Sequence, residues 1–565
     1  MRIRIISIVI IGVALIMSVR LYFVQVVHGD TFAQDAERQH INKNTLLYDR
    51  GAIYFDPKSG EESWAAISRS GYTIAVNPSI IKSQESLFEA LSPILPIKKD
   101  EFFAKTANKF DQYKEIATHL NSETTDKIKK LNLYGVTIST DKKRFYPGGR
   151  MASHTIGFVG FENDKVVGKY GLERYYEANL KKDPSSAYNN FFAEFFMNVK
   201  DSFSDSSEQS GDIYTTIEPS VQLLLEDELN KVMDTWGSEG AGGVIMDPNT
   251  GEIVALAWQP GFDPNDLSGE SLEKFKNPIV ESVYEMGSII KPITMASGLD
   301  SHVVTASTTY YDAGFLTLNS KRISNYDGKG RGTATMQMVL NQSLNTGAAY
   351  VALKMGNEKF SEYMKNFGLG TETGIDLPNE ARGLVKNLDS KREIEMATAS
   401  YGQGIALTPI ATVRALSVLA NGGTLVVPHI VKKINYDNGL SKKMSFAPGK
   451  RVISEEASKE ITRMLVTVVD TSLRNGTAKI PGYSVAAKTG TAQMADEGKA
   501  GYTEGKYLHS FFGYFPAYKP KFMVFLFHIY PKNVRYASET LTDPFLNITR
   551  FLLNYYQIPP DRPEN

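Results

Sequence analysis

The chain is organised around one stretch, Tyr284-Glu-Met-Gly-Ser-Ile-Ile-Lys-Pro-Ile-Thr294, which holds a serine and a lysine at the spacing Ser-x-x-Lys. In a helix that begins near Ser288, this spacing puts the hydroxyl of Ser288 and the amine of Lys291 one turn apart on one face. Pro292 fits the first turn of such a helix, where a missing N–H costs least. A buried lysine with a lowered pKa can take the proton of a serine hydroxyl and make it a nucleophile. The spacing also occurs by chance, with the serine as a helix cap or surface residue, so the rest of the chain has to decide.

The overall composition excludes several classes of function. With 565 residues, 42% of them hydrophobic, the chain can form about two or three packed domains. The formal net charge of −1 argues against non-specific binding of nucleic acid. The absence of cysteine excludes disulfides, zinc–thiolate sites and thiol nucleophiles. No two of the eight histidines have ligand spacing on one helix, so we expect neither a metal nor a cofactor.

The N-terminus predicts a membrane anchor. Residues 5–27 are mostly apolar and numerous enough to span a bilayer, and Arg20 near the outer end can extend its guanidinium to the interface. Arg2 and Arg4 precede this run, so the positive-inside rule predicts a single pass with a short cytoplasmic N-terminus and an extracytoplasmic remainder. The alternative is a cleaved signal peptide, but no small-x-small cleavage site follows the apolar run.

Residues 28–211 predict a separate α+β domain with a spacer or docking role. Apolar spacing indicates helices at residues 30–42, 83–91, 100–120 and 122–131, and a strand at residues 133–139. Residues 201–211 are polar and predict a linker or an exposed hairpin. No combination of nucleophile and base stands out in this part of the chain, so we assign no chemistry to it.

Residues 212–565 predict an α/β domain. The order of a helix, a hairpin, a helical insert, three strands and a closing helix is typical of an antiparallel sheet with flanking helices. The expected elements are strands at residues 212–217, 483–487, 510–515 and 522–529, a hairpin over residues 242–257, and helices at residues 219–236, 336–340, 348–355 and 541–556.

Two further clusters strengthen the Ser-x-x-Lys signal. Asn341-Gln-Ser-Leu-Asn-Thr-Gly347 holds Ser343 and Asn345 at the spacing Ser-x-Asn, and Lys488-Thr-Gly-Thr491 follows at the end of a predicted strand. Alone, the first cluster is typical of a turn or cap and the second of a strand end. In this order, each in its helix, loop or strand setting, the three clusters closely match motifs of penicillin-binding proteins and class A β-lactamases.

The residue types suit acyl transfer from a peptide with a free terminus, which needs a nucleophile, a proton shuttle, an oxyanion hole and a carboxylate clamp. We expect Ser288 to attack and Lys291 to take its proton. Ser343 can relay a proton to the leaving amine, and Asn345 can orient the substrate amide. A cation at Lys488 would attract a terminal carboxylate and help to lower the pKa of Lys291.

The carboxylate clamp is expected on the Lys488-Thr-Gly-Thr491 stretch, where Thr489 and Thr491 can hydrogen-bond a carboxylate. The backbone N–H groups of Ser288 and Thr491 are the expected oxyanion donors. Plain strand alternation places Lys488 and Thr489 on opposite faces, so periodicity cannot supply both as site residues. That part of the assignment comes from the motif resemblance.

With these residues in hand, the chain resembles the class B penicillin-binding proteins, which are monofunctional peptidoglycan transpeptidases. Three segments are similar to family motifs before and beside the site: Arg50-Gly-Ala-Ile-Tyr54, Asp247-Pro-Asn-Thr-Gly-Glu-Ile-Val-Ala255 and Tyr401-Gly-Gln-Gly404. A fourth, Lys506-Tyr-Leu-His-Ser-Phe-Phe-Gly-Tyr-Phe-Pro516, is closer in form to division-type than to elongation-type members.

The resemblance implies an anchor at residues 1–27, a pedestal or dimerisation domain at residues 28–211, and a serine-β-lactamase-like transpeptidase domain with a helical subdomain at residues 212–565. It implies D-alanyl-D-alanine stem peptides as substrate and β-lactams as inhibitors. The implied partners are the membrane, a polytopic membrane glycosyltransferase and proteins of the divisome or elongasome, but not nucleic acid. The implied substrate-binding residues are Asn345, Lys488, Thr489, Gly490 and Thr491.

Two other functions stay open. A β-lactamase or D,D-carboxypeptidase of the same fold would pass the acyl group to water, and rapid turnover of nitrocefin would indicate it. No Glu-x-x-x-Asn element can be placed as a deacylating base, which argues against the lactamase. A non-catalytic scaffold or β-lactam sensor would keep its cellular role after Ser288→Ala.

Overall fold

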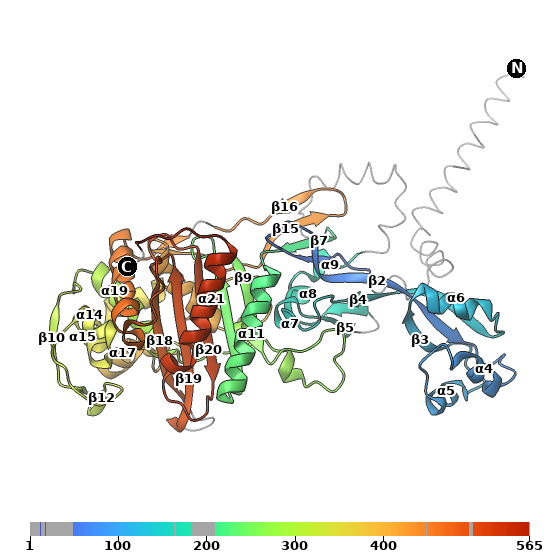
Figure 1. The fold of residues 1–565 in the computed structure, drawn as a ribbon, viewed down its shortest axis with the longest axis horizontal. Coiled ribbons are helices and arrows are strands. Elements are labelled where there is room, and N and C mark those ends of the chain that lie inside the picture. Colours follow the sequence, from blue (N-terminus) through green and yellow to red (C-terminus); the bar gives the residue numbers. More distant parts are fainter. Residues whose placement is uncertain are drawn as a thin grey trace, which may run out of the picture. The chain divides into compact units, whose positions relative to one another are not determined.

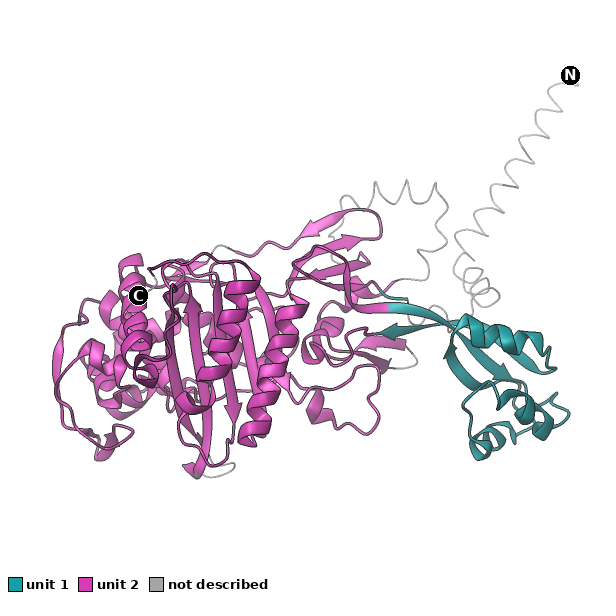
Figure 2. Ribbon diagram, viewed as in Figure 1, with its two compact units in different colours: residues 1–50, 68–145, 183–189 teal, residues 51–67, 146–182, 190–565 magenta. Residues whose placement is uncertain are grey.

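A computed structural model describes residues 49–162, 165–182, 209–447, 449–495 and 501–563, together with Gly12 and Met17. The chain divides into two compact units (Figure 2): unit 1 comprises residues 1–50, 68–145 and 183–189, and unit 2 comprises residues 51–67, 146–182 and 190–565. Apart from Gly12 and Met17, the predicted anchor lies outside the described residues, as do the predicted helix at residues 30–42 and most of the predicted linker at residues 201–211. No helix in the described ranges has both the length and the apolar content needed to cross a membrane.

Unit 1 is a small α+β structure in which two strands pair with the same neighbour. Strand β2 pairs antiparallel with β3 and also pairs with β4. Helix α4 begins where the side chain of Ser83 accepts a hydrogen bond from the backbone N–H of Ser86. The described elements are β2 (Ser63–Val76, from residue 68 onward in this unit), α4 (Gln84–Leu91), α5 (Lys99–Thr106), β3 (Lys114–Leu120), α6 (Ser122–Lys130) and β4 (Val136–Phe145).

The predicted helices at residues 83–91 and 122–131 are confirmed by α4 and α6. The prediction of a single helix over residues 100–120 is wrong, because α5 ends at Thr106 and residues 114–120 form β3. The backbone N–H of Asp111 donates to the carbonyl of Asn108 in the intervening turn. Pairing with β2 satisfies the β3 backbone, a non-local contact that outweighs the helical spacing of the apolar residues.

The core of unit 2 is a five-stranded antiparallel sheet in the order β18–β19–β20–β8–β9 (Figure 1). Its strands are β8 (Gly240–Met246), β9 (Ile253–Gln259), β18 (Ala486–Ala495), β19 (Tyr502–Phe515) and β20 (Phe522–Ile529). The predicted hairpin over residues 242–257 and the last two predicted strands are confirmed. The strand expected at residues 483–487 starts later and does not end before Lys488: β18 continues through the motif, because all four motif residues pair with β19.

One face of this sheet is covered by α11 (Pro219–Trp236) and α21 (Thr542–Tyr555) (Figure 1). Both helices confirm the sequence prediction. The start of α11 follows from Glu218, whose side chain accepts a hydrogen bond from the backbone N–H of Val221, and from Pro219 in the first turn. The helix ends at Gly237, whose positive φ of 57° suits a residue without a side chain.

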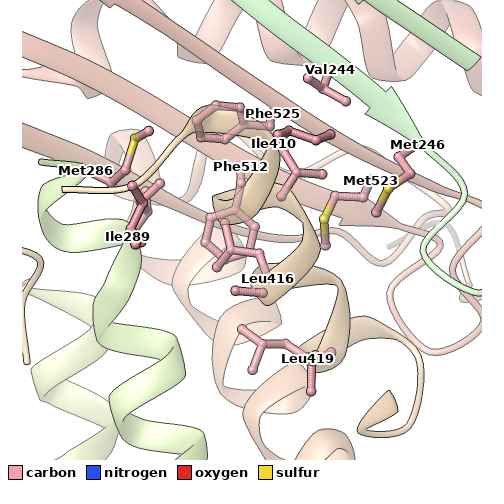
Figure 3. Close-up of a cluster of buried hydrophobic side chains, with 14 of the residues drawn as sticks. Val244, Met246, Met286, Ile289, Ile410, Leu416, Leu419, Phe512, Met523 and Phe525 are labelled. Atoms are coloured by element: carbon pink, nitrogen blue, oxygen red, sulfur yellow. The ribbon is translucent and has the colours of Figure 1, made fainter. Parts of the chain in front are cut away.

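The other face packs against a helical subdomain. Its main helices are α13 (Lys291–Asp300), α14 (Met336–Asn341), α15 (Asn345–Met355), α18 (Pro409–Ala420) and α19 (Glu455–Thr471). Figure 3 shows how Phe512 and Phe525 of the sheet meet Ile410 and Leu416 of α18, with Ile289 beside them. The nucleophile segment is therefore held against the sheet by a continuous apolar core.

Unit 2 also holds shorter elements. In a sheet separate from the five-stranded one, β7 pairs antiparallel with β15 and parallel with β1, and β1 pairs with the start of β2. These and the remaining described elements are β1 (Ile53–Phe55), α7 (Ser153–Ile156), β5 (Val159–Glu162), β6 (Lys165–Gly168), α8 (Gly171–Tyr175), α9 (Glu177–Leu180), β7 (Gly211–Thr215), α12 (Pro278–Glu281), β10 (Thr309–Asp312), β11 (Phe315–Leu318), β12 (Lys321–Ser324), β13 (Gly332–Thr335), α16 (Asn357–Asn366), α17 (Glu393–Ala399), β14 (Thr424–Leu425), β15 (Val431–Tyr436), β16 (Ser441–Lys443), β17 (Lys450–Arg451) and α20 (Ala537–Thr540).

Candidate active site

Ser288 lies in a short 3-10 helix, Gly287–Ile290, that leads directly into α13. In a 3-10 helix, side chains three residues apart lie above one another. The Oγ of Ser288 is accordingly 2.9 Å from the Nζ of Lys291, which confirms the predicted approach of the two side chains. Pro292 falls in the first turn of α13, where its missing N–H leaves no hydrogen bond unmade.

Two glycines allow the nucleophile turn to approach β18. Gly287 has a φ of +64°, and a Cβ atom there would lie 3.0 Å from the carbonyl oxygen of Thr491. A Cβ atom at Gly490 would lie 2.8 Å from the carbonyl oxygen of Met286. The hydroxyl of Ser510, on β19, donates to that same carbonyl at 3.0 Å. The third residue of Lys-Thr-Gly is therefore a glycine because the turn before Ser288 packs directly on it.

Lys291 is buried, with 1% of its surface exposed. Its Nζ contacts the carbonyl oxygen of Ser343 at 2.6 Å and the Oγ of Ser343 at 3.0 Å, in addition to Ser288. Burial, together with the nearby charge of Lys488, holds the pKa of Lys291 well below its usual range. A neutral amine has two N–H groups and one lone pair, so it can donate both N–H groups to Ser343 and keep the lone pair for the Ser288 hydroxyl.

Ser343 lies between α14 and α15 in a left-handed backbone conformation with φ of 53°. This conformation is uncommon for serine and points to a position that the surrounding structure enforces. The Oγ of Ser343 is 3.0 Å from the Nζ of Lys291 and 3.1 Å from the Nζ of Lys488. One hydroxyl thus joins the two lysines, which lie 197 residues apart in the sequence.

Lys488 enters the site from β18, the edge strand of the sheet. Only 3% of its surface is exposed, and its Nζ donates to the carbonyl oxygen of Thr489 at 2.9 Å. Burial lowers the pKa of Lys488 to about 7, because the charged form loses its hydration. Lys488 can therefore change its charge within the physiological pH range.

The two threonines of the motif differ from Lys488 in side-chain direction. Lys488 pairs with Phe512 and Thr489 pairs with Phe511, and these two phenylalanines lie in different cores on opposite faces of the sheet. The alternation expected from the sequence therefore persists along β18. Thr491 lies two residues after Thr489 and therefore on the same face of β18. Its Oγ1 accepts a hydrogen bond from the backbone N–H of Ala537 at 3.1 Å.

The backbone of β18 faces the Ser288 turn along the open edge of the sheet. The carbonyl of Thr491 lies on the side of Gly287, away from β19. In an antiparallel strand, the N–H and C=O of one residue point to the same side, so the N–H of Thr491 also faces this edge. The backbone N–H of Thr491 therefore lies on the Ser288 side of β18, where an oxyanion donor is expected from the sequence.

A buried polar network that the sequence did not predict positions the Ser343–Asn345 loop. The carboxylate of Asp312 accepts hydrogen bonds from the side chains of Asn325 and Thr346, at distances of 3.0 and 2.8 Å for the shortest contact of each. Asn345 donates from Nδ2 to the carbonyl oxygen of Ser324 at 2.8 Å, which leaves its Oδ1 available. The sequence shows only a polar, glycine-containing run at residues 324–331, which gives no sign of its partners.

Glu285, three residues before Ser288, was also missed. Its carboxylate accepts hydrogen bonds from the backbone N–H of Gly404 at 2.9 Å and from the hydroxyl of Tyr502 at 3.0 Å. Burial raises the pKa of Glu285. Glu285 thus joins the nucleophile turn, the Tyr401–Gly404 segment and the start of β19. Only its place beside the motif could have drawn attention to it.

Within the described ranges, no group of three or more His, Cys, Asp or Glu side chains could hold a metal ion. The groups gathered around Ser288 are hydroxyls, amines and backbone N–H groups, an arrangement suited to covalent catalysis by a serine.

A serine acyltransferase site on an antiparallel sheet with flanking helices defines the class of protein. Residues 241–549 match the family described as "Penicillin binding protein transpeptidase domain", and residues 49–190 match "Penicillin-binding Protein dimerisation domain". The chain belongs to the penicillin-binding protein family, as a class B member in which the two domains are combined. It is an enzyme, a penicillin-binding transpeptidase of peptidoglycan synthesis.

Known relatives match nearly the whole chain. "Stage V sporulation protein D" of Bacillus subtilis is 32% identical, covering 97% of this chain and 84% of that protein. "Peptidoglycan D,D-transpeptidase FtsI" of Escherichia coli K12 is 27% identical, covering 96% of this chain and 90% of that protein. Among solved structures, Penicillin Binding Protein 2X from Streptococcus thermophilus has the same fold, with a TM-score of 0.72 at 21% identity over 90% of this chain and 79% of that one.

Proposed function

We propose that this enzyme cross-links peptidoglycan stem peptides by D,D-transpeptidation through an acyl-enzyme on Ser288. The observation that carries the proposal is the buried Lys291 amine, which lies 2.9 Å from the Oγ of Ser288 and 3.0 Å from the Oγ of Ser343. A neutral Lys291 takes the proton of Ser288 as the hydroxyl attacks. We also propose that the enzyme acts in cell division and not in elongation of the side wall, because the Lys506–Pro516 stretch resembles division-type members.

The proposed acylation uses these groups in order. The Oγ of Ser288 bonds to the carbonyl carbon of the penultimate D-alanine, and the backbone N–H groups of Ser288 and Thr491 hold the oxyanion. The C–N bond to the terminal D-alanine then breaks, and the proton taken by Lys291 reaches the leaving amine through Ser343. In the second half-reaction, an acceptor amine attacks the ester carbon, the C–O bond to Ser288 breaks, and the proton from the amine returns to the Ser288 oxygen by the same route.

The remaining residues hold the substrate. Asn345 accepts the substrate amide N–H on Oδ1, because its Nδ2 is bound to Ser324. Lys488, in its charged form, attracts the terminal carboxylate, and the hydroxyls of Thr489 and Thr491 hydrogen-bond it. Gly490 lets the strand backbone approach both the nucleophile turn and the ligand. Thr489 and Thr491 both alternate with Lys488 along β18, so the carboxylate contacts of both threonines require a local departure from this alternation when a ligand binds.

The test is covalent labelling with a fluorescent penicillin. The wild-type chain becomes labelled on Ser288, and Ser288→Ala loses the label while keeping its melting temperature. The matched control is Ser297→Ala, which removes a buried hydroxyl of α13 that donates only to the carbonyl of Ile293; it keeps the label. Label on folded Ser288→Ala would overturn the assignment of the nucleophile. Rapid nitrocefin turnover would favour the β-lactamase alternative.

The cellular setting is part of the same proposal. It comprises a single-pass anchor at residues 1–27 with a cytoplasmic N-terminus, a pedestal or dimerisation domain at residues 28–211 and an extracytoplasmic transpeptidase domain at residues 212–565. The partners would be a polytopic membrane glycosyltransferase and the division machinery. A fluorescent fusion that collects at the septum would support the division assignment, and one along the side wall would contradict it.

A further inference from the structure

A chain of four buried side chains lies behind the carboxylate clamp, and the mechanism above does not use it. It consists of Ser238, His528, Thr540 and His509, all buried. The Oγ of Ser238 is 2.7 Å from Nδ1 of His528, whose Nε2 is 2.9 Å from the Oγ1 of Thr540. That hydroxyl is 3.0 Å from Nδ1 of His509, whose Nε2 is 3.1 Å from the carbonyl oxygen of Arg535.

The donor and acceptor groups of these residues allow only one direction of donation along the hydrogen-bond chain. The carbonyl of Arg535 can only accept, so Nε2 of His509 carries the hydrogen. Burial holds the pKa of His509 at about 4, so at neutral pH its Nδ1 has no hydrogen and accepts from the hydroxyl of Thr540. The single hydrogen of Thr540 is then committed, although the carbonyl of Ala537 lies 3.4 Å away as a weaker acceptor.

The same reasoning extends to the other end of the chain. The Oγ1 of Thr540 must accept from Nε2–H of His528. Burial, together with His509, keeps the pKa of His528 well below its usual value, so its Nδ1 accepts from the hydroxyl of Ser238. Every hydrogen bond therefore runs from Ser238 toward Arg535, and each hydroxyl and ring is fixed in one orientation. Fully satisfied buried networks of this kind hold their members rigidly.

This chain of hydrogen bonds ends at Arg535, in the segment that contacts Thr491 of the proposed carboxylate clamp. His509 pairs across the strands with Thr491 on one side and with His528 on the other. Two residues after Arg535, the backbone N–H of Ala537 donates to the Oγ1 of Thr491 at 3.1 Å. This bond occupies a lone pair of the hydroxyl, so the hydrogen of Thr491 is free to be donated elsewhere. A ligand carboxylate accepts hydrogen bonds only, so it requires the hydroxyl in this donating state.

We propose that Ser238, His528, Thr540 and His509 are positioning residues that hold the residue 535–537 segment so that Thr491 presents its hydroxyl as a donor to the carboxylate of the acyl donor. The proposal rests on the clamp role proposed above for Thr491. The four residues touch neither ligand nor nucleophile, and they act only through the backbone of residues 535–537.

The experiment is a double-mutant cycle on the full-length chain in detergent, with benzylpenicillin as the carboxylate-bearing probe. Thr540→Val removes the hydroxyl at the centre of the chain and lowers the second-order rate constant of acylation roughly tenfold, the value of one hydrogen bond. Thr540→Ser restores it to within about twofold. The matched control is Thr549→Val, which removes a buried hydroxyl of α21 that donates only to the carbonyl of Phe545; it leaves the rate constant unchanged.

The cycle separates this proposal from the one it rests on. In a Thr491→Val background, Thr540→Val has no further effect, because the hydroxyl it orients is gone. An equal loss in both backgrounds overturns the positioning role. Unchanged acylation in Thr491→Val alone would instead overturn the clamp.

A second measurement needs no variant. Nitrogen NMR of the histidine-labelled wild-type chain shows His509 and His528 both as the neutral Nε2–H tautomer at pH 7. The Nδ1–H tautomer in either residue would overturn the directed chain, whatever the folding of the variants.

Discussion

Two lysines that contact the same hydroxyl set the behaviour of the site at the residue scale. The Nζ atoms of Lys291 and Lys488 lie 3.0 and 3.1 Å from the Oγ of Ser343. Two buried ammonium groups at such separation repel each other, so protonation of one disfavours protonation of the other. In the proposed mechanism, a neutral Lys291 serves as the base and a charged Lys488 attracts the substrate carboxylate.

This division predicts the pH dependence of acylation. Lys291 must be neutral, so acylation rises as pH increases through its lowered pKa. Lys488 must be charged, and its pKa is lowered to about 7, so acylation falls as pH increases beyond that value. Lys488→Arg keeps a cation at all accessible pH values and should remove the alkaline fall, whatever its absolute rate. The measurement is the second-order rate constant with benzylpenicillin from pH 5 to 10, and an unchanged alkaline limb in Lys488→Arg would contradict the assignment.

Removal of the Ser343 hydroxyl tests the proton relay. We expect Ser343→Ala to slow acylation by roughly 10²- to 10⁴-fold, the range typical of a general acid–base group. The φ of 53° at this position costs serine and alanine alike, because both carry a Cβ atom, so Ser343→Ala adds no new backbone strain. Ser343→Gly removes the same hydroxyl without that backbone cost. Stopped-flow acylation of both variants should therefore give similar rates, and a wild-type rate in Ser343→Gly would rule out the relay.

At the scale of elements, the site depends on how closely a 3-10 turn packs on an edge strand. Ser510 and Gly490 belong to neighbouring strands, and both meet the carbonyl of Met286 in the turn. No helix or strand supplies the whole site. The distance between α13 and β18 therefore controls whether Ser288 and the backbone of Thr491 can act on one carbonyl group.

Gly490→Ala should separate the turn from the strand. Its Cβ would lie 2.4 Å from the Oγ of Ser510 and 2.8 Å from the carbonyl oxygen of Met286, and a backbone oxygen cannot yield as a side-chain tip can. We expect a loss of roughly 1–3 kcal/mol in unfolding free energy and a large fall in acylation rate. The control is Gly160→Ala in β5, which meets only the flexible side chain of Lys169. Thermal unfolding and penicillin labelling that show equal effects for the two variants would contradict the prediction.

The start of α11 gives a stability change without a catalytic one. Glu218 accepts hydrogen bonds from the backbone N–H of Val221 and from the hydroxyl of Tyr555. Glu218→Ala removes both acceptors and should reduce the unfolding free energy by about 1 kcal/mol or more. Glu218→Gln keeps one acceptor and should lose less. Denaturant unfolding measures the change. Without denaturant, where both variants are fully folded, the acylation rate should stay at the wild-type value.

At the scale of the whole molecule, the proposed anchor has a direct test. A chain that begins at residue 28 should appear in the soluble fraction, because it lacks the apolar run at residues 5–27, while the full chain stays with membranes after carbonate extraction. Both forms should bind fluorescent penicillin, since every proposed site residue lies in residues 288–491. Soluble full-length protein after extraction would contradict the anchor.

The sequence by itself determined the class of fold, the order of the three motifs, the strands of the central sheet and the helices α11, α14, α15 and α21, but not α18 or α19. These features are local: α11, the β8–β9 hairpin and the approach of Ser288 to Lys291 follow from spacing, caps and turn residues. The prediction of one helix at residues 100–120 is wrong because residues 114–120 pair with β2, a contact that is not local in sequence.

Only the tertiary structure decided how the motifs cooperate. The contact of one Ser343 hydroxyl with two lysines, the carboxylate of Asp312 behind the loop and the His509–Thr540–His528 chain all join residues that are distant in sequence. The lowered pKa values of Lys291 and Lys488 likewise arise from burial, which depends on every element packed around them. Residue spacing in the three motifs indicates the type of chemistry. The distances between the motif side chains and the exclusion of water from the two lysines exist only after the chain has packed.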